Sequence, residues 1–467
     1  MSTARRLLCL GSRATLCVCL FALTVVSASA QDGGDGDDII FNETPIAGID
    51  VDAAGVLKIK TFDPRLARQR LVAARAAAAD QEVMRDSDLR KVSLRRLERE
   101  IAAAVAEGRN LTEEMRALAG LTSIEYVFFY PEQNDIVLAG PAEGFTIDPT
   151  ERLIGMDTGR PVVLLEDLVT AMRAYAPGAD ATGVISVSID PTAEGLRRMQ
   201  QFLARVRPSL RPGDARELAA GLKNNLGLQK VTFRGIPPQT HFARVLVEAD
   251  YRMKLIGIGL ERTPIRLMSY VERANPRTVA SNAMERWYFQ PNYDGVSVSD
   301  DATAMRIEER GVELVGANER VTGGQRQRSA RVNKASQAFT RDFTEKFNDI
   351  ADRVRVYAEL RQLIDVAIAA AYIQEQDFYT QAGWDGGVLM DESSVPVETY
   401  TAPVQVETAV NAIWKGNTLM TPLGGGVSIQ PRMALRSDRV DVDTSGETVA
   451  VKNESFEDLP AERWWWD

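Results

Sequence analysis

All three cysteines of this 467-residue chain lie near its start, at Cys9, Cys17 and Cys19. The rest of the chain can therefore form neither disulfide bonds nor cysteine-ligated zinc sites, and thiolate catalysis is excluded there. Such a chain must be held together by the packing of apolar side chains. Because 45% of the residues are hydrophobic, the composition predicts a folded protein with a substantial core.

Residues 1–30 have the three-part pattern of a secretory signal peptide. Its basic residues are Arg5, Arg6 and Arg13. An apolar stretch at 16–26 follows, too short to span a bilayer, and small residues at 28–30 favour cleavage between Ala30 and Gln31. We therefore expect a secreted or periplasmic protein.

The charge balance after residue 30 limits the partners. The first 30 residues hold three basic and no acidic side chains, so the remainder carries 52 Lys and Arg against 65 Asp and Glu, a net charge of −13. Such a chain has no overall attraction for nucleic acid or an anionic membrane. The best later candidate for a membrane span, 363–373, is short and contains Asp365. We expect no nucleic-acid partner, and no membrane span once the signal is removed.

Changes in pattern divide the chain after the signal into six segments. These are a flexible acidic leader at 31–38, a hairpin with a helical region at 39–120, a mixed α/β core at 121–330, a long helical segment at 331–377, short strands and loops at 378–440, and a mobile tail at 441–467. Strand and helix patterns alternate in the core, and helices flank it. The organisation therefore predicts an α+β fold.

The segment 335–377 shows the strongest helical periodicity. Its apolar residues recur every three or four positions, and they are Phe339, Phe343, Phe347, Ile350, Val354, Tyr357, Leu360, Ile364, Ala367 and Ala371. A single helix here would be about 65 Å long, and a break or a helical hairpin is the alternative. The apolar face either packs on the main domain or forms a coiled coil that joins copies into a homo-oligomer.

His241 is the only histidine in the chain. A zinc protease motif needs two histidines on one helix, and His-rich zinc or copper sites need two or three, so neither can form. A serine triad could use His241, but the chain contains no Gly-x-Ser-x-Gly elbow. We expect no metal and no cofactor.

The sequence around His241 predicts the start of a helix, because Thr240 is a good N-cap residue. Helical spacing places His241, Arg244, Glu248 and Arg252 on one polar side. This side is either a solvated, salt-bridged surface or a binding or acid–base site. These four residues are the first candidates for a binding site, while catalytic residues stay unassigned.

Two glycine-containing motifs are weaker signals. Asp157-Thr158-Gly159 is the tripeptide of aspartic proteases, but one copy is present where two carboxylates are needed, so a polar turn is favoured. Gly424-Gly425-Gly426 precedes a predicted strand, and a phosphate-binding loop would precede a helix. The paired carboxylates of a glycosidase are not recognisable from a local sequence motif, so a glycosidase is neither indicated nor excluded.

Trp464, Trp465 and Trp466 follow a polar segment near residue 467. Three exposed indoles would form a large apolar patch on the surface, and such patches favour aggregation or binding. They either dock in a groove on this protein or bind a partner, and they are the second group of binding candidates.

Several stretches resemble a planctomycete family of exported proteins defined only as a domain of unknown function. The principal stretch is His241–Lys254 with Pro238-Gln239-Thr240 before it, and the supporting stretches are 158–161, 164–168, 356–360 and 424–429. The resemblance extends from the first hairpin to the last glycine turn. It implies export, and it brings no catalytic residue or cofactor.

These observations lead to two hypotheses. The first is a non-enzymatic exported protein that binds or scaffolds in the cell envelope, with an envelope protein or a glycan as partner. The alternative is a carboxylate-based hydrolase of polysaccharide or peptide, with His241 as a possible participant.

Overall fold

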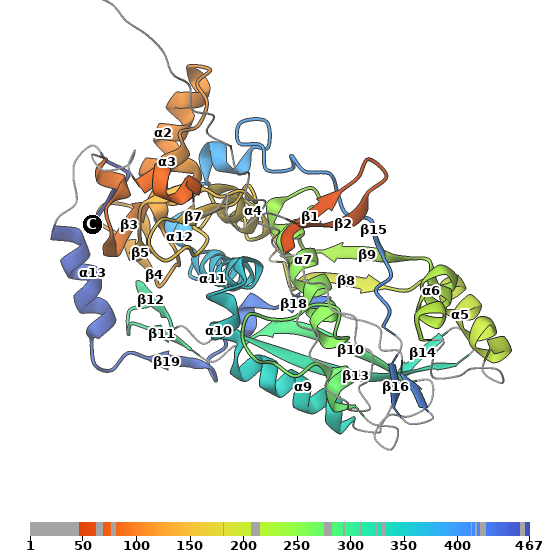
Figure 1. Cartoon of the computed structure of the whole chain (residues 1–467). Coiled ribbons are helices and arrows are strands. Elements are labelled where there is room, and N and C mark those ends of the chain that lie inside the picture. Colours follow the sequence, from red (N-terminus) through yellow and green to blue (C-terminus); the bar gives the residue numbers. More distant parts are fainter. Residues whose placement is uncertain are drawn as a thin grey trace, which may run out of the picture. The chain divides into compact units, whose positions relative to one another are not determined.

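Two large β-sheets with helices between and around them dominate the computed structural model of the chain (Figure 1). Two small two-stranded sheets accompany them among the described residues, β6 (Phe145–Ile147) with β7 (Leu153–Gly155) and β16 (Ile413–Lys415) with β17 (Thr418–Met420). The structure describes residues 46–61, 69–75, 81–180, 182–206, 215–274, 283–292, 295–308, 311–322, 325–328, 333–411, 413–415, 418–420, 426–457 and 463–467. The predicted signal peptide with its cleavage point, and the predicted acidic leader, lie outside these residues. The segments predicted within 39–467 belong to one compact unit, Asp38–Asp467.

The first sheet has nine strands and mixed directions. In spatial order they are β1 (Ile46–Val51), β2 (Val56–Thr61), β15 (Gln405–Glu407), β9 (Leu228–Arg234), β8 (Ile185–Asp190), β18 (Gly426–Ile429), β10 (Ala283–Pro291), β13 (Val312–Thr322) and β14 (Gln325–Arg328). Two neighbouring pairs, β2 with β15 and β10 with β18, run parallel, and the other pairs are antiparallel. The mixed sheet, together with the helices described below, confirms the α+β prediction.

The second sheet has seven strands. In spatial order they are β19 (Val440–Val442), β11 (Val296–Val298), β12 (Ala304–Ile307), β4 (Tyr126–Tyr130), β5 (Asp135–Ala142), β3 (Ser87–Ser93) and β20 (Trp465–Trp466). β4 and β5 form a hairpin. β3 lies in the region predicted as helical after the first hairpin, so that prediction missed a strand. Its pairing partner β5 lies more than 40 residues away in sequence, and local pattern gives little sign of such pairing.

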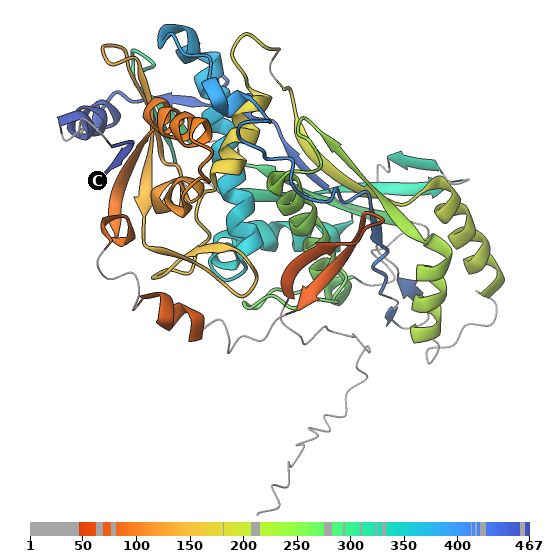
Figure 2. The ribbon, with the colours of Figure 1, turned by 90° about the horizontal axis from the view of Figure 1, so that it is seen from above.

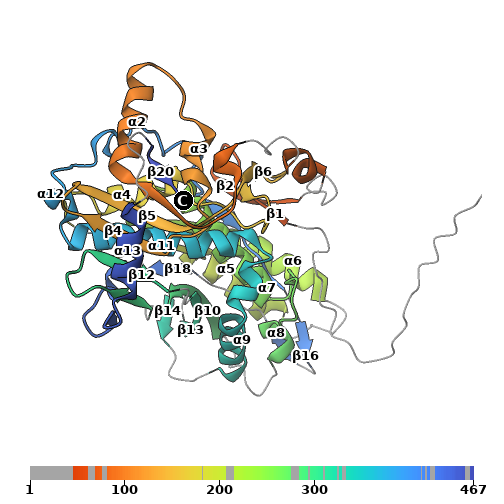
Figure 3. The same ribbon diagram turned by 90° about the vertical axis from the view of Figure 1, so that its left-hand side faces the viewer.

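Helices fill the space between the sheets (Figures 2 and 3). α7 (His241–Gly257) packs on the first sheet against β8, β10 and β18, and α11 (Arg355–Glu375) packs against α7 and α4 (Leu165–Ala174). α2 (Leu94–Ala106) packs on β5 of the second sheet. This layer brings the N-terminal ends of α4 and α7 near Glu359 and Gln362 in the N-terminal half of α11.

The remaining helices are peripheral or short. They are α3 (Glu113–Arg116), α5 (Ala193–Val206), α6 (Ala215–Leu226), α8 (Tyr270–Arg273), α9 (Lys334–Glu345), α10 (Phe347–Ala351), α12 (Phe378–Gln381) and α13 (Glu447–Glu457). Among the described residues, no helix is long and apolar enough to cross a membrane.

The predicted long helical segment is divided into α9, α10 and α11, with breaks at Lys346 and between Asp352 and Val354. All ten residues of the apolar stripe are buried within this chain. α11 is buried on nearly every side, because the protein surrounds it. Packing within the chain thus accounts for the periodicity, and association of copies through 335–377 stays a prediction.

The segment predicted as a mobile tail, 441–467, contains regular structure in its described part. β19 pairs with β11 at one edge of the second sheet, and β20 pairs with β3 at the other. α13 runs between them and packs on β12. Trp464, Trp465 and Trp466 are only 7%, 5% and 4% exposed, which matches the interpretation that they dock on this protein.

Candidate functional site

A cavity of about 500 Å³ opens where α4, α7 and α11 meet the α2–α3 loop and the 394–400 loop. This volume lies within the range of small-molecule sites. The polar side chains that line it come from separate elements, and they are Arg109, Asn110, Arg116, Glu151, Arg152, Glu166, Asp167, His241, Glu359, Gln362, Ser394, Thr399 and Tyr400. Their convergence makes this cavity the candidate site.

His241 stands at the first position of α7 because the Thr240 hydroxyl caps the helix and accepts a hydrogen bond from the Ala243 N–H at 3.2 Å. The imidazole Nδ1 lies 2.9 Å from Oδ2 of Asp167, a buried residue in the first turn of α4. A carboxylate at Nδ1 fixes the proton on that nitrogen. No described residue hydrogen-bonds Nε2, so this nitrogen is available on a ring that lines the cavity.

The ionic surroundings favour the charged form of His241. Burial alone lowers the pKa of the imidazole, and the ion pair with Asp167 opposes this effect. The negative charges of Glu166 and Glu359 act in the same direction, and together they raise the His241 pKa to about 9. At neutral pH the ring is therefore an imidazolium, and Nε2 carries a proton that it can donate.

Glu166 and Tyr400 form the second pair at the floor of the cavity. The Tyr400 hydroxyl donates a hydrogen bond to Glu166 Oε1 at 3.0 Å. Burial raises the pKa of Glu166, and the charge of Asp167 raises it further, while His241 and Arg116 lower it. The Tyr400 ring lies 5.9 Å from the His241 ring. This floor thus contains an imidazolium beside a carboxyl group that ionises less readily than usual.

A buried network of ion pairs adjoins the floor, and two of its members, Arg152 and Glu359, also line the cavity. Arg152 contacts Glu248 at 2.6 Å and Glu359 at 2.9 Å, and Arg252 contacts Glu261 at 2.7 Å and Glu248 at 3.4 Å. Burial raises the pKa of Glu359, but Arg152 opposes this shift, and the two arginines hold the pKa of Glu248 below its usual value. Buried charges in a paired network of this kind hold α7, α11 and the 148–152 turn together.

The predicted polar side of α7 is therefore not a solvated surface. Glu248 and Arg252 are 3% and 8% exposed, and they belong to the buried network of ion pairs. Arg244 donates to the carbonyl of Ile49 at 3.1 Å, and its guanidinium lies 4.9 Å from the centre of the Tyr400 ring. Of the four candidates on α7, only His241 lines the cavity.

Sequence reasoning missed most of the residues that complete this site. Asp167 lies 74 positions from His241, and Glu359 and Tyr400 come from the second half of the chain. Glu166, Asp167 and Glu359 carried some signal, since they fall in two of the stretches that resemble a known family, 164–168 and 356–360. Their spatial relation to His241 has no local mark in the sequence.

The other group of candidates, the three tryptophans, does not line the cavity, and one of them, Trp465, covers a buried arginine. The Arg90 side chain is fully buried beneath the Trp465 ring, whose centre is 4.6 Å from the guanidinium carbon. Arg90 donates to the carboxylate of Asp467 at 2.7 and 3.0 Å. It also donates to the carbonyls of Val83, Ala119 and Arg85 at 2.8, 2.7 and 3.0 Å. We call this arrangement of Arg90, its carbonyl partners, Trp465 and Asp467 the Arg90 socket.

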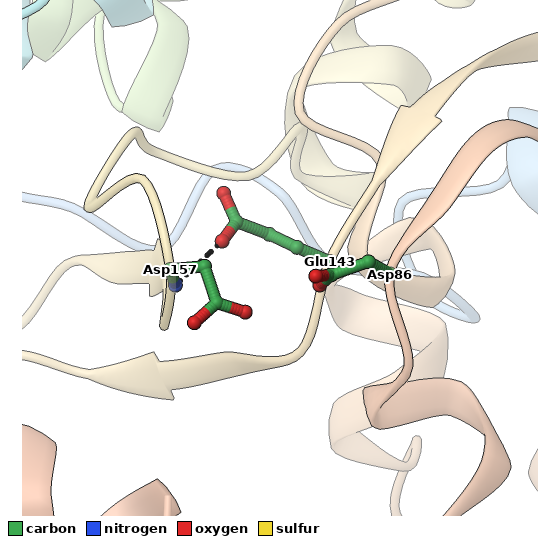
Figure 4. A group of neighbouring side chains, drawn as sticks. All are labelled: Asp86, Glu143 and Asp157. Carbon is green, nitrogen blue, oxygen red and sulfur yellow. Dashed lines mark hydrogen bonds between the residues drawn. The ribbon is translucent and has the colours of Figure 1, made fainter.

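The Asp-Thr-Gly tripeptide lies in a turn beside two other carboxylates, Asp86 and Glu143 (Figure 4). Carboxylate oxygens of Asp86, Glu143 and Asp157 lie within 4.8 Å of one another. The buried Glu143 accepts hydrogen bonds from the backbone N–H groups of Asp157 and Thr158 at 2.6 and 2.9 Å, and Asp157 pairs with Arg75 at 3.2 Å. Burial and the neighbouring carboxylates raise the pKa of Asp86. Glu143 thus closes the turn, which favours the turn interpretation over a protease site.

Residues 187–270 match the model of a family described as "Protein of unknown function (DUF1598)". No curated protein and no solved structure matches the chain. The match runs from β8 to the start of α8, so the wider extent predicted for the family resemblance is supported only over this segment. It includes His241, while Glu166, Asp167, Glu359 and Tyr400 lie outside it.

Proposed function

We propose that this is an exported protein that binds a small polar molecule in the cavity at His241. The observation that carries the proposal is the His241–Asp167 pair, in which Nδ1 is engaged and Nε2 is open on a cavity. A ligand that accepts a hydrogen bond from the charged imidazole forms a charge-assisted pair, a kind of hydrogen bond that contributes about 1.5–3 kcal/mol.

The distribution of ionisable groups supports a binding site at this place. Side chains with shifted pKa values, His241, Glu166 and Glu359, line one cavity and come from three different helices. Shifted pKa values that cluster in a cavity are typical of functional sites.

A ligand screen tests this proposal. Wild type and His241→Gln would be screened by thermal shift against sugars, amino acids, nucleotides and organic acids, followed by calorimetry on each compound that stabilises the wild type. We expect at least one compound that stabilises the wild type and has no effect on the variant. If no compound depends on His241, the proposal fails.

Export and an envelope location belong to the same proposal, and the signal pattern at 1–30 supports them. Mass spectrometry of the protein recovered from envelope and cytoplasmic fractions would test them. We expect a mature chain that begins at Gln31 in the envelope fraction. A chain that keeps residues 1–30 in the cytoplasmic fraction would contradict export.

A second candidate function is hydrolysis by carboxylates in the same cavity. Glu166 favours it, because a raised pKa makes a carboxyl group better suited to act as a general acid. Assays of wild type and Glu166→Gln with chromogenic glycosides and peptides would test whether the protein is a hydrolase. Hydrolysis requires turnover that the variant loses while it still binds the product.

A further inference from the structure

We infer that the ligand of this cavity is a sugar acid, a hydroxyl-rich molecule with one carboxylate. The carboxylate lies at Arg116 at the mouth, and the hydroxyl groups meet the floor at His241, Glu166 and Gln362. This inference rests on the proposed function and names the class of ligand.

The mouth of the cavity presents positive charge. Arg109 and Arg116 are both exposed and both line the cavity. Within the described part of the chain, the Arg116 side chain makes no hydrogen bond and no ion pair, and the Arg109 side chain pairs with the exposed Glu107. The acidic residue beside them, Glu151, lies 3.9 Å from Lys60, which offsets its charge. An unpaired guanidinium presents a planar fork of N–H donors that fits a carboxylate.

The floor presents a mixed set of donors and acceptors. His241 offers Nε2–H as a donor. The buried Gln362 donates through Nε2 to the carbonyls of Thr122 and Pro161, both at 2.6 Å, and this leaves its Oε1 as an acceptor with no partner among the described residues. Glu166 provides a carboxyl group. Hydroxyl groups satisfy such a set best, because each one both donates and accepts.

One wall of the cavity is apolar. It is formed by Leu153, Val162, Leu164, Val395 and Val397. A sugar ring has polar edges and C–H faces, so it can pack on this wall while its hydroxyl groups reach the floor. The wall is also held in place, since Arg173 donates to the carbonyls of Leu389 and Val395 at 2.9 and 2.8 Å.

Other ligand classes fit the charges less well. A highly charged anion such as a phosphate would meet the carboxylates of Asp167 and Glu359 at the floor. A cation would meet the arginines at the mouth and the imidazolium below them. A neutral polyol would leave Arg116 unused. A molecule with one carboxylate and several hydroxyl groups meets all of these groups favourably.

Calorimetry with matched sugars tests the inference on the full protein. The probes are glucuronate, galacturonate and mannuronate, each compared at pH 7 and low salt with its neutral counterpart, glucose, galactose or mannose. We expect at least one acid to bind about tenfold or more tightly than its neutral counterpart, since a charged hydrogen-bonded pair contributes on that scale.

Arg116→Gln should reduce the affinity for the acid to that for the neutral sugar. Arg99→Gln, which changes an exposed arginine on α2 outside the cavity, should leave the preference unchanged.

Two results would overturn the inference: no acid preferred over its neutral sugar, or a preference that survives in Arg116→Gln. Arg116 is exposed, so this variant should fold, and circular dichroism would verify it. If a compound of another class binds in a His241-dependent manner and no sugar acid does, the sugar-acid inference fails and the proposed function stands. If no compound depends on His241, both fail.

Discussion

The Arg90 socket and the cavity floor both bury a cation against an aspartate, but they differ in how many donors the protein satisfies. A guanidinium has five N–H donors, and in the socket all of them reach oxygen atoms of Asp467 or of backbone carbonyls. In the floor, Asp167 engages one nitrogen of His241 and leaves the other open.

This difference separates a structural ion pair from a binding site. The socket has no donor left for a ligand, and the Trp465 ring covers it. The floor keeps a donor and an acceptor accessible from a cavity of about 500 Å³. Buried charge alone therefore does not identify a functional site in this protein, whereas unsatisfied donors beside a cavity do.

The largest expected effect comes from breaking the socket. Arg90→Met should lower the free energy of unfolding by about 3–5 kcal/mol, because it leaves Asp467 and three carbonyls without their donor. Urea denaturation would measure this against Arg99→Met as the control, which should change stability by less than about 0.5 kcal/mol. Ligand binding in the cavity should persist. A loss below about 1 kcal/mol for Arg90→Met would show that the socket is not structural.

The matching change in the floor should have a smaller effect on stability and a larger one on binding. His241→Gln should lower the free energy of unfolding by about 1.5–3 kcal/mol, because Asp167 loses its ion pair. This is the usual contribution of a charged hydrogen bond. It should also abolish ligand binding. Denaturation and calorimetry on the same preparation would measure both. Unchanged affinity would remove the distinction between the two regions.

The pH dependence of stability sharpens the comparison further. The folded-state pKa of His241, about 9, lies above the usual value of 6.5 because Asp167, Glu166 and Glu359 surround the ring. Its contribution is therefore fully present below pH 6.5, decreases as the pH rises, and is lost above pH 9. The difference in unfolding free energy between wild type and His241→Gln should decrease in the same way as the pH rises. The decrease should be at most about 1.4 kcal/mol per pH unit. A difference that is constant from pH 6 to 10 would contradict the charged pair.

The smallest expected effect concerns the second pair in the floor. Tyr400→Phe removes the hydrogen bond to Glu166 and should cost about 0.5–1.5 kcal/mol in unfolding free energy. Because that bond lowers the pKa of Glu166, the variant should show a still higher pKa for this carboxyl group. Denaturation and carboxyl-selective NMR titration would measure the two changes. A lower pKa in the variant would contradict the assigned hydrogen bond.

The sequence predicted the local features well. Thr240 caps α7 at the position expected, and its hydroxyl accepts a hydrogen bond from the backbone N–H three residues later. The hairpin at 46–61 also lies in the segment predicted to begin with a hairpin. Helix caps and hairpin turns depend on neighbouring residues, so a linear pattern contains them.

Long-range pairing was harder to predict. β3 was missed because it contains the charged residues Arg90 and Lys91, which look unsuited to a buried strand. Both are buried because β5 and β20 pair with the strand from either side and the socket neutralises Arg90. The tail was predicted as mobile from its polar composition, and the burial of its tryptophans against β3 decides otherwise.

By itself, the sequence determined the α+β class, the start of α7 at His241, and the absence of cysteine after position 19. Only the tertiary structure decided what His241 does, because Asp167, Glu166, Glu359 and Tyr400 approach it from distant parts of the chain. It also decided which candidates are structural, since Glu248, Arg252 and the tryptophans are enclosed by other elements. The physical reason is that capping and periodicity act over a few residues, whereas burial and ion pairing depend on which elements fold together.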